Sequence, residues 1–333
     1  MGTPNFSIPA LEQLITAPDI QVVGVYTKAP KEAKRGQKVL KSPIHELALL
    51  HDIPVFTPST LKTSDQLEIF RNLKADIALI VAYGLILPKN IIESTKFGCV
   101  NIHPSLLPKY RGATPIQSAL LNGDKVSGMS IIQMDEGVDS GDILLQEEYE
   151  LGEGDDYPVL AEKFAHLGAK MALKAVRGVI EGSLSGVKQD DSQASLSRKI
   201  QKSDAKIDLN SNLSSILNKI RAFSDFMTAF IEFRGEKIKI YKAREVSTSE
   251  LNGFPNSNQE NKQRELVETG NHSSNSEVVT EKIDSNFIAF EGGLVNKDFI
   301  FKCGDGGYFQ PQILQKPGKN RVAIKDFLLG FRV

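Results

Sequence analysis

Apolar runs and amphipathic segments alternate through the first half of the chain, and this alternation limits the possible fold more than any other feature. The apolar runs have the length and continuous hydrophobicity of buried strands, and they cover residues 21–27, 53–57, 76–84, 99–103 and 129–134. The segments between them repeat apolar residues at helical spacing, at residues 9–17, 42–52, 64–74 and 114–123, with Ser42 as a favoured N-cap. Strand and helix in alternation form a parallel sheet covered on both faces. We therefore predict an α/β domain with a doubly wound, mostly parallel, Rossmann-like sheet.

The pattern changes after a long amphipathic helix that we predict at about residues 156–181. Residues 1–182 are predicted to form the first domain, and the polar, serine-rich residues 183–203 are predicted to be a linker. Residues 204–333 then hold a helix and period-two strands with Asp-Gly and Gly-Gly turns, which predicts a small β-barrel domain. Within that domain, about residues 247–285 are rich in Ser, Asn and Glu and are predicted to be a disordered insertion.

Composition narrows the class of protein. The chain has 333 residues, enough for two domains with separate cores. No apolar run reaches the ~18–20 residues of a membrane span, and no charged-then-apolar leader is seen. The two cysteines, Cys99 and Cys303, lie outside any metal-ligand spacing. We expect a cytoplasmic protein without a membrane segment, a zinc ribbon or a disulfide framework.

Positive charge gathers in one segment, although the net charge is −1. Residues 28–41 hold six basic side chains and one acidic side chain, Glu32. Such a run is often only a solvated loop, and a net charge near zero argues against a surface positive throughout. Contact with nucleic acid is therefore expected only at patches, formed by this segment and by basic residues of the second domain, namely Arg234, Lys237, Lys239, Lys242 and Arg244.

An amide and an imidazole end the fourth predicted strand. Asn101 and His103 are two residues apart, so both side chains point to one face, about 6.5–7 Å apart along the strand. Ligands bind at the carboxyl ends of strands in such sheets, and an amide N–H beside a protonated imidazole suits an oxyanion. For these two residues alone, an ordinary polar strand end remains an open alternative. Cys99 shares the face but lies ~13 Å from His103, too far for a Cys–His nucleophilic pair.

Acidic side chains follow the next predicted strand, in a loop that contains Asp135, Glu136, Asp139 and Asp142. The loop lacks the register and the distal glutamate of an EF-hand calcium site. If neighbouring parallel strands end side by side, a carboxylate from this loop meets His103. It would raise the pKa of the imidazole by charge pairing and help to take a proton from an attacking amine. The two strand ends together predict a site that polarises a carbonyl group.

Four motifs, in this order, resemble those of the folate-dependent formyltransferases. They are GTPNF at residues 2–6, IVAYGLILPK at 80–89, NIHPSLLPKYRGATPIQ at 101–117 and MDEGVDSGDIL at 134–144. Residues 304–330 are similar to the end of the second domain in one branch of that family. The resemblance thus covers nearly the whole chain, and the combination of Asn-x-His, Ser-Leu-Leu-Pro, Arg-Gly and Asp-x-Gly is highly specific.

The resemblance implies roles for individual residues. It implies catalytic roles for Asn101, His103 and Asp139. It implies contacts to the folate co-substrate from Ser105, Leu106, Leu107 and Pro108, and from Ala82, Tyr83, Gly84 and Leu87. In the basic segment it implies tRNA contacts from Lys34, Arg35 and Lys38.

The reaction that the resemblance implies begins translation. 10-Formyltetrahydrofolate donates its formyl group to the α-amine of methionine esterified to initiator tRNA, and no metal is required. Asn101 and His103 would hold the tetrahedral oxyanion, while Asp139 would orient His103 and help to move the proton. The expected partners are 10-formyltetrahydrofolate and methionyl initiator tRNA, bound by a monomer.

The chain departs from the family pattern in three places. The family has a strand before the position of residues 2–4, an aromatic–proline segment after the position of 221–223, and no insertion like 247–285. Two competing functions follow. The acceptor could be an amino-sugar nucleotide, because those relatives have a comparable second domain, whereas the enzymes that formylate glycinamide ribonucleotide have a single domain. Alternatively, the chain is a truncated paralogue that binds folate or tRNA without turnover.

Overall fold

The computed structural model describes residues 1–32, 39–225, 227–252 and 298–330. Its contacts divide the chain into two compact units, residues 1–201 and residues 202–333, which we describe separately. Within the described residues, no helix combines the length and the hydrophobicity needed to span a membrane.

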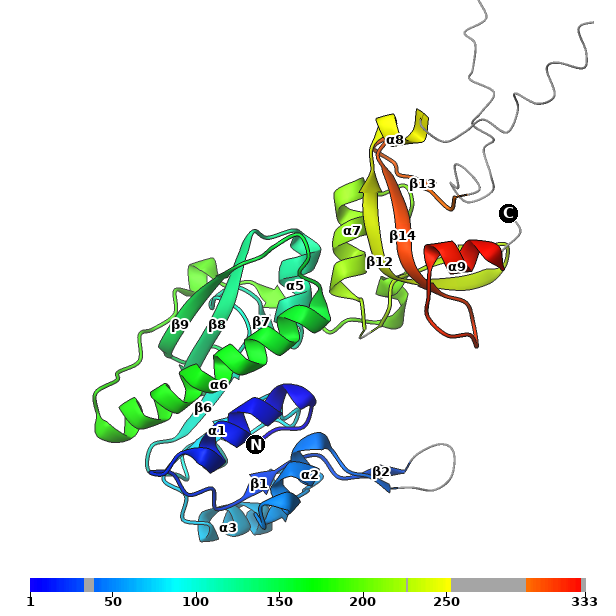
Figure 1. Ribbon diagram of the computed structural model, residues 1–333. Helices are drawn as coiled ribbons and strands as arrows, with labels where there is room; N and C mark the ends of the chain where they lie inside the picture. The colour runs from blue at the N-terminus through cyan, green and yellow to red at the C-terminus, as the bar shows by residue number, and fades with distance from the viewer. Residues whose placement is uncertain (33–38, 226, 253–297, 331–333) are drawn as a thin grey trace, which may run out of the picture. The chain divides into compact units, whose positions relative to one another are not determined.

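A four-stranded sheet forms the centre of the first unit (Figure 1). Its order is β5 (Ala78–Ile80), β6 (Cys99–His103), β8 (Val126–Gln133) and β9 (Ile143–Glu150). β5 and β6 are parallel, whereas β8 is antiparallel to both β6 and β9. The predicted fold class is confirmed, but β8 runs against the direction expected in a parallel sheet. The hydrophobicity of a buried strand does not encode its direction, so the sequence pattern could not reveal this reversal.

A second, parallel pair of strands, β1 (Val25–Tyr26) and β4 (Val55–Phe56), lies beside this sheet. The first two residues join the pair to β5. The backbone N–H of Gly2 donates to the carbonyl of Tyr26 at 2.9 Å, and the N–H of Val81 donates to the carbonyl of Met1 at 2.8 Å. Met1 and Gly2 therefore lie at the position where the resemblance implies a first strand.

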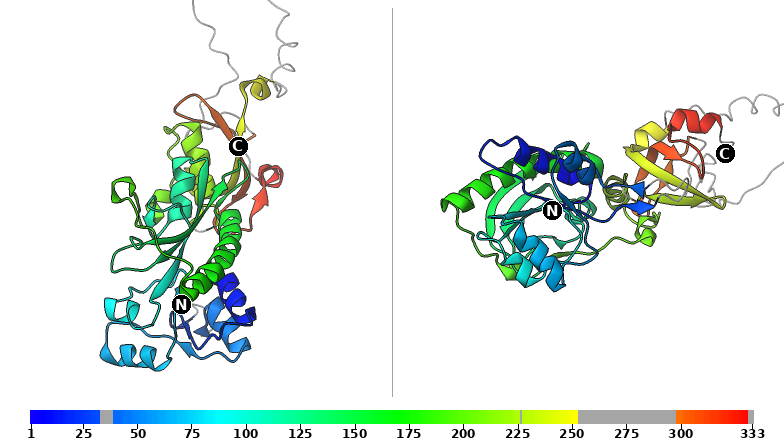
Figure 2. Two further views of the ribbon diagram at one scale, coloured as in Figure 1. Left: turned by 90° about the vertical axis from the view of Figure 1, so that its left-hand side faces the viewer. Right: turned by 90° about the horizontal axis from the view of Figure 1, so that it is seen from below.

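Helices cover both faces of the sheet, as predicted (Figure 2). α1 and α6 pack together on one side, α6 lies along β6 and β8, and α3 lies on the other side (Figures 1 and 2). Ser42 caps α2 as predicted, because its hydroxyl accepts a hydrogen bond from the backbone N–H of His45 at 3.2 Å. The helices of this unit are α1 (Ile8–Thr16), α2 (Pro43–Leu50), α3 (Ser64–Asn72), α4 (Lys89–Ile92), α5 (Pro115–Asn122) and α6 (Tyr157–Glu181).

The segment predicted to be a linker is folded against the first unit as far as residue 201. Within it, β10 (Leu196–Ser197) pairs in parallel with β7 (Arg111–Gly112), and Val187 forms an antiparallel bridge with Ile143. We call residues 183–201 the strap. The linker prediction was wrong for the strap because serine side chains, which are typical of linkers, also hydrogen-bond readily to backbone groups.

The second unit contains α7 (Leu213–Ala222) and a curled antiparallel sheet (Figure 1). This sheet confirms the fold class predicted from the period-two pattern. β14 lies at its centre and pairs with β12 along one edge and with β13 and β15 along the other. The strands are β11 (Phe230–Phe233), β12 (Glu236–Val246), β13 (Phe301–Lys302), β14 (Tyr308–Gln315) and β15 (Val322–Ala323), and the last helix is α9 (Ile324–Leu329).

The first residues of the predicted disordered insertion are folded. They form a short helix, α8 (Thr248–Asn252), in which Glu250 forms an ion pair with Arg244 of β12 at 2.6 Å. A charged side chain that pairs with the preceding strand can order a polar segment, and composition alone misses this effect. Residues 253–285 lie outside the described residues.

Candidate active site

The structure brings together the three side chains for which the resemblance implies catalytic roles. Asn101 and His103 lie on β6 and are buried, with exposed fractions of 8% and 3%. Asp139 comes from the connection between β8 and β9, and its carboxylate lies against both of them. The side-chain N–H of Asn101 donates to Oδ1 of Asp139 at 3.2 Å, and Nδ1 of His103 lies 3.4 Å from Oδ2.

Asp139 reaches His103 by a different route from the one we predicted. Because β8 is antiparallel to β6, with Ser130 opposite His103, the acidic loop leaves the sheet beside the start of β6 and not beside its end. The loop then turns back along β6. Gly141 permits this return, since a Cβ at that position would lie 1.8 Å from the carbonyl oxygen of Gln133. The proximity that we attributed to parallel strand ends is therefore produced by the loop.

Two backbone groups of the loop after β6 complete the cluster. The N–H of Gly112 donates to Oδ2 of Asp139 at 2.8 Å, and the carbonyl of Tyr110 lies 3.0 Å from Nε2 of His103. Gly112 has a φ of 115°, and a Cβ there would lie 2.6 Å from the carbonyl of Ser197. A glycine is required at this position because the strap passes so closely. The sequence motif contains this glycine, but its contact with Asp139 was not predicted.

Burial decides the protonation of His103. Burial lowers the pKa of the imidazole, and the Asp139 carboxylate and the Tyr110 carbonyl raise it by a smaller amount. Our prediction that Asp139 raises this pKa has the right sign for Asp139 alone, but burial outweighs the charge. In the neutral ring, the short contact with Tyr110 favours the proton on Nε2. The lone pair of Nδ1 then faces the cluster, at a distance from Asp139 longer than an ordinary N–H···O bond.

The strap holds the Asp139 loop from its other side. The side-chain N–H groups of Gln189 donate to the carbonyls of Asp139 and Gly141, both at 2.8 Å. Oε1 of Gln189 accepts from Nε and Nη2 of Arg111 at 3.0 and 2.9 Å, and Arg111 also pairs with Asp191 at 2.7 Å. Sequence reasoning missed Gln189, because a lone glutamine in a polar segment carries no local signal.

The residues expected to contact folate after β6 are divided between the core and the surface. Ser105 and Leu107 are buried, and the hydroxyl of Ser105 donates to the carbonyl of Lys109 at 2.6 Å. Leu106 and Pro108 are half-buried, and the Leu107–Pro108 peptide bond is cis. The side chains of Leu106 and Pro108 are therefore the ones in this motif that remain open to a ligand.

The residues expected to contact folate after β5 alternate in the same way. Tyr83 and Leu87 are buried in the core, and the Tyr83 hydroxyl has no hydrogen-bond partner among the described residues. Ala82 and Gly84 are exposed, and both have positive φ values, 49° and 78°. The loop thus presents small residues and backbone groups to solvent, together with Ile86, whose exposed fraction is 77%.

An ion pair brings this loop close to the acidic loop. Lys89, which begins α4, pairs with Glu136 at 2.7 Å. Ile86 on one loop and Val138 on the other are both exposed, Val138 by 66%. We call these two loops the rim of the site, because the ion pair joins them and each carries an exposed apolar side chain. Among the described residues, no three His, Cys, Asp or Glu side chains are grouped so that they could hold a metal ion.

The three predicted tRNA contacts, Lys34, Arg35 and Lys38, lie outside the described residues. The strands beside them are described. β2 (Lys31–Glu32) pairs with β3 (Val39–Leu40) in antiparallel register, so the two described parts of the basic segment lie side by side.

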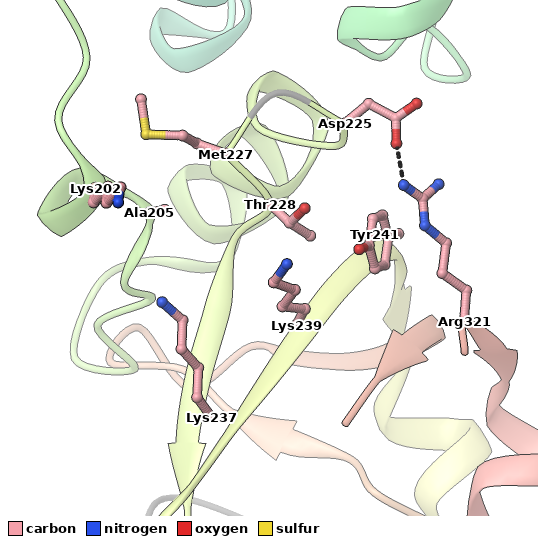
Figure 3. A pocket seen from close by; sticks show the side chains of 9 residues that line it. All are labelled: Lys202, Ala205, Asp225, Met227, Thr228, Lys237, Lys239, Tyr241 and Arg321. Atoms are coloured by element: carbon pink, nitrogen blue, oxygen red, sulfur yellow. Dashed lines mark hydrogen bonds and ion pairs between the residues drawn. The ribbon is translucent and has the colours of Figure 1, made fainter. Parts of the chain in front are cut away.

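The second unit has a basic pocket that sequence reasoning found only in part (Figure 3). Its volume is about 320 Å³, and it is lined by Lys202, Ala205, Asp225, Met227, Thr228, Lys237, Lys239, Tyr241 and Arg321. Lys237 and Lys239 extend into it from β12 (Figure 3). The single carboxylate, Asp225, pairs with Arg321 at 2.6 Å. Arg234, Lys242 and Arg244, which were expected to belong to the same basic patch, do not line the pocket.

The two units are those of a formyl transferase. Residues 2–176 match the formyl transferase family model, and residues 199–332 match the model of the formyl transferase C-terminal domain. The chain belongs to the formyl transferase family and, within it, to the branch of the methionyl-tRNA formyltransferases, as its relatives show.

The methionyl-tRNA formyltransferase of Alkaliphilus oremlandii (strain OhILAs) is 39% identical over 330 residues, covering 99% of this chain and 95% of that protein. The enzyme of Wolbachia sp. subsp. Drosophila simulans (strain wRi) is 37% identical over 332 residues, covering 100% and 95%.

Solved structures show the same fold. The N-formyltransferase from Helicobacter canadensis, in complex with folinic acid and dTDP-3-aminofucose, matches with a TM-score of 0.61 at 20% identity, over 95% of this chain and 97% of that one. The sugar 3N-formyl transferase WlaRD, with dTDP and 5-N-formyl-THF, matches with a TM-score of 0.59 at 21% identity, over 96% and 97%. At this level of identity the likeness concerns the fold and not the acceptor.

Proposed function

We propose that this chain transfers the formyl group of 10-formyltetrahydrofolate to the α-amino group of methionyl initiator tRNA, at the start of translation. The observation that carries the proposal is the contact of the Asp139 carboxylate with both Asn101 and His103. It occurs in a chain whose full-length relatives are named methionyl-tRNA formyltransferases. We assign the reaction to the cytoplasm, because charged initiator tRNA is its acceptor.

Asn101 supplies the donor for the oxyanion in this proposal. One N–H of its amide is held by Asp139, and the other has no partner among the described residues. An amide group has two such hydrogens, so the bond to Asp139 orients the second one and leaves it available to donate to the substrate. A donor that is fixed before the substrate arrives stabilises the developing negative charge most effectively. Asn101 therefore polarises the formyl carbonyl.

His103 moves the proton. With Nε2–H donating to Tyr110, the free Nδ1 accepts a proton from the methionyl amine as its nitrogen attacks the formyl carbon. The tetrahedral intermediate then collapses, the bond from carbon to N10 of the folate breaks, and the same proton passes to N10. The Asp139 carboxylate stabilises the imidazolium during the transfer. In this mechanism Asn101 stabilises the oxyanion, and the His103–Asp139 pair transfers the proton.

The described residues fit the folate co-substrate at the rim of the site. Ile86 and Val138 offer apolar surface for its rings, and Ala82 and Gly84 leave the backbone open beside them. We propose that these residues, with Leu106 and Pro108, bind 10-formyltetrahydrofolate. The buried side chains of Tyr83, Leu87, Ser105 and Leu107 would then support the binding loops from behind.

Two basic regions suit the phosphates of tRNA. We propose that the pocket of the second unit, with Lys202, Lys237, Lys239 and Arg321, binds backbone phosphates, which fix position without reading sequence. The basic residues between β2 and β3, Lys34, Arg35 and Lys38, are proposed as the second contact. Both regions are local, which agrees with a net charge of −1.

The competing acceptors can be separated directly. Purified protein should be assayed with 10-formyltetrahydrofolate and either methionyl initiator tRNA or an amino-sugar nucleotide. We expect formylation of the tRNA, with a kcat/KM at least 100-fold above that for the sugar nucleotide. The reverse preference would favour a sugar formyltransferase. Binding of folate or tRNA without turnover on either acceptor would favour a non-catalytic paralogue.

A further inference from the structure

We propose that Gln189 of the strap is a positioning residue that holds Asp139 against Asn101 and His103. This inference depends on the role proposed above for Asp139. Gln189 touches neither Asn101 nor His103 in the described structure, so its effect on the reaction passes through the Asp139 loop. This role would make the strap part of the support of the active site in the first unit.

The hydrogen bonds of Gln189 use its whole amide group. Both N–H hydrogens are given to the acidic loop, at the carbonyls of Asp139 and Gly141. The oxygen accepts two hydrogen bonds from Arg111, the residue before the Gly112 N–H that binds the Asp139 carboxylate. One side chain thus connects the two segments between which Asp139 lies. An aliphatic side chain of similar size would leave two loop carbonyls and a guanidinium without these partners.

Asp139 needs such support because its backbone is in the left-handed region, with a φ of 51°. A residue with a Cβ rarely adopts this conformation, and it persists only where its surroundings impose it. The carbonyl that Gln189 holds belongs to Asp139 itself, and the other belongs to Gly141, which makes the close approach to Gln133. Gln189 therefore acts where the loop turns back toward β6.

Two backbone attachments fix Gln189. Val187 bridges to Ile143, where β9 begins, and the pair β10–β7 follows a few residues later. Serine hydroxyls of the strap strengthen the second attachment, since Ser195 accepts from the N–H of Tyr110 at 2.9 Å. The carbonyl of Tyr110 in turn faces His103. The strap therefore supports both polar neighbours of His103, Asp139 through Gln189 and Tyr110 through Ser195.

The test compares three single variants in the full chain. Q189L removes all four hydrogen bonds, and Q189E keeps the acceptor for Arg111 but loses both donors to the loop. Q193L is the matched control, because Gln193 is an exposed glutamine of the same strap. A misplaced catalytic group costs up to about 100-fold in rate. We expect Q189L and Q189E to lower kcat roughly 10–100-fold, with KM values for both substrates within about threefold of wild type, and Q193L to leave kcat unchanged.

A double-mutant cycle with D139N distinguishes positioning from a general structural effect. If Gln189 acts through Asp139, then Q189L should cost much less in the D139N background than in the wild-type background. An equal loss in both backgrounds would overturn the proposal. If D139N itself keeps full activity, the proposed role of Asp139 fails, and this inference fails with it. If D139N is inactive but Q189L is not impaired, only the inference fails.

A spectroscopic readout is independent of turnover. The imidazole pKa of His103, measured by NMR titration, should fall in Q189L in the same direction as in D139N, because the carboxylate moves away from the ring. An unchanged pKa in Q189L would contradict the proposal. Circular dichroism shows whether each variant is folded. If Q189L does not fold, Q189E carries the test, and loss of folding in both would assign Gln189 to stability and overturn the positioning role.

Discussion

The side-chain amide of Asn101 donates a hydrogen bond of 3.2 Å to the carboxylate of Asp139, a residue 38 positions later in the chain. This bond decides which way the amide points, because the carboxylate accepts only from the nitrogen. The bond therefore also orients the second amide hydrogen, which remains available to donate to a substrate. The carboxylate of Asp139 is also held by the Gly112 N–H, so the pair is fixed from both sides.

Replacing Asn101 should remove the oxyanion donor and spare the fold. We expect N101A to lower kcat about 10²–10³-fold, the usual effect of losing one such donor. N90A is the control, since Asn90 is exposed on the short helix α4. Steady-state assays with methionyl initiator tRNA and thermal unfolding would measure both quantities. Turnover by N101A within threefold of wild type would exclude Asn101 from the mechanism.

The activity should depend on a neutral His103. Burial lowers the pKa of its imidazole, so in the free enzyme the acidic limb of the kcat/KM profile should lie below the ordinary histidine value of about 6.5. Asp139 opposes this effect, because its negative charge favours the imidazolium. D139N should therefore move the pKa of His103 further down. NMR titration of the ring checks the direction, and an upward shift in D139N would contradict the assignment.

The same pKa shift links stability to pH. The folded state binds the proton on His103 less readily than the unfolded chain does. Between the folded pKa and about 6.5, the unfolded state therefore holds more protons, and the free energy of unfolding falls as the pH falls. As the pH is lowered from 7 to the folded-state pKa of His103, the free energy of unfolding should fall less in H103Q than in wild type. Urea unfolding at several pH values measures this, and parallel curves for the two proteins would exclude the linkage.

Gly141 should not tolerate a side chain. A Cβ there would lie 1.8 Å from the carbonyl of Gln133, so G141A must displace the loop that carries Asp139. We expect a loss of stability of about 1–3 kcal/mol, typical of overpacking, together with a loss of kcat. G154A is the matched control, because a Cβ at Gly154 meets no atom within 4 Å. Wild-type activity in G141A would show that the return of the loop does not depend on this glycine.

The basic pocket should affect the binding of tRNA and not the rate of the chemical step. In the double variant K237Q/K239Q, we expect a higher KM for methionyl initiator tRNA, with kcat and the KM for the folate unchanged. If each lysine contacts one phosphate, the slope of log affinity against log salt should fall by about 1.4–1.8 in magnitude. K302Q is the control, since Lys302 is exposed on β13. An unchanged salt slope would place the tRNA elsewhere.

Local patterns predicted much of this protein. The five apolar runs contain β1, β4, β5 and β6 and most of β8, but they miss the short strands β2, β3 and β7. The helical spacing located α1, α2, α3, α5 and α6 within about two residues. The period-two pattern within residues 204–333 predicted strands in the second unit, where β11, β12 and β14 are observed. These features are visible because burial of one face imposes a repeat on the residues that share it. The spacing of Asn101 and His103 is readable for the same reason, since two residues of one strand share a face.

The sequence by itself determined which residues occupy the cluster and which elements carry two of them. The tertiary structure alone decided how the third arrives, because the antiparallel direction of β8 and the return of the Asp139 loop depend on contacts between distant segments. It also turned a serine-rich segment into the strap, and it placed Gln189 between Arg111 and the acidic loop. Hydrogen bonds between segments that are far apart in the chain produce no periodic pattern in the sequence. Strand direction, loop return and the role of a lone glutamine are therefore visible only once the chain is folded.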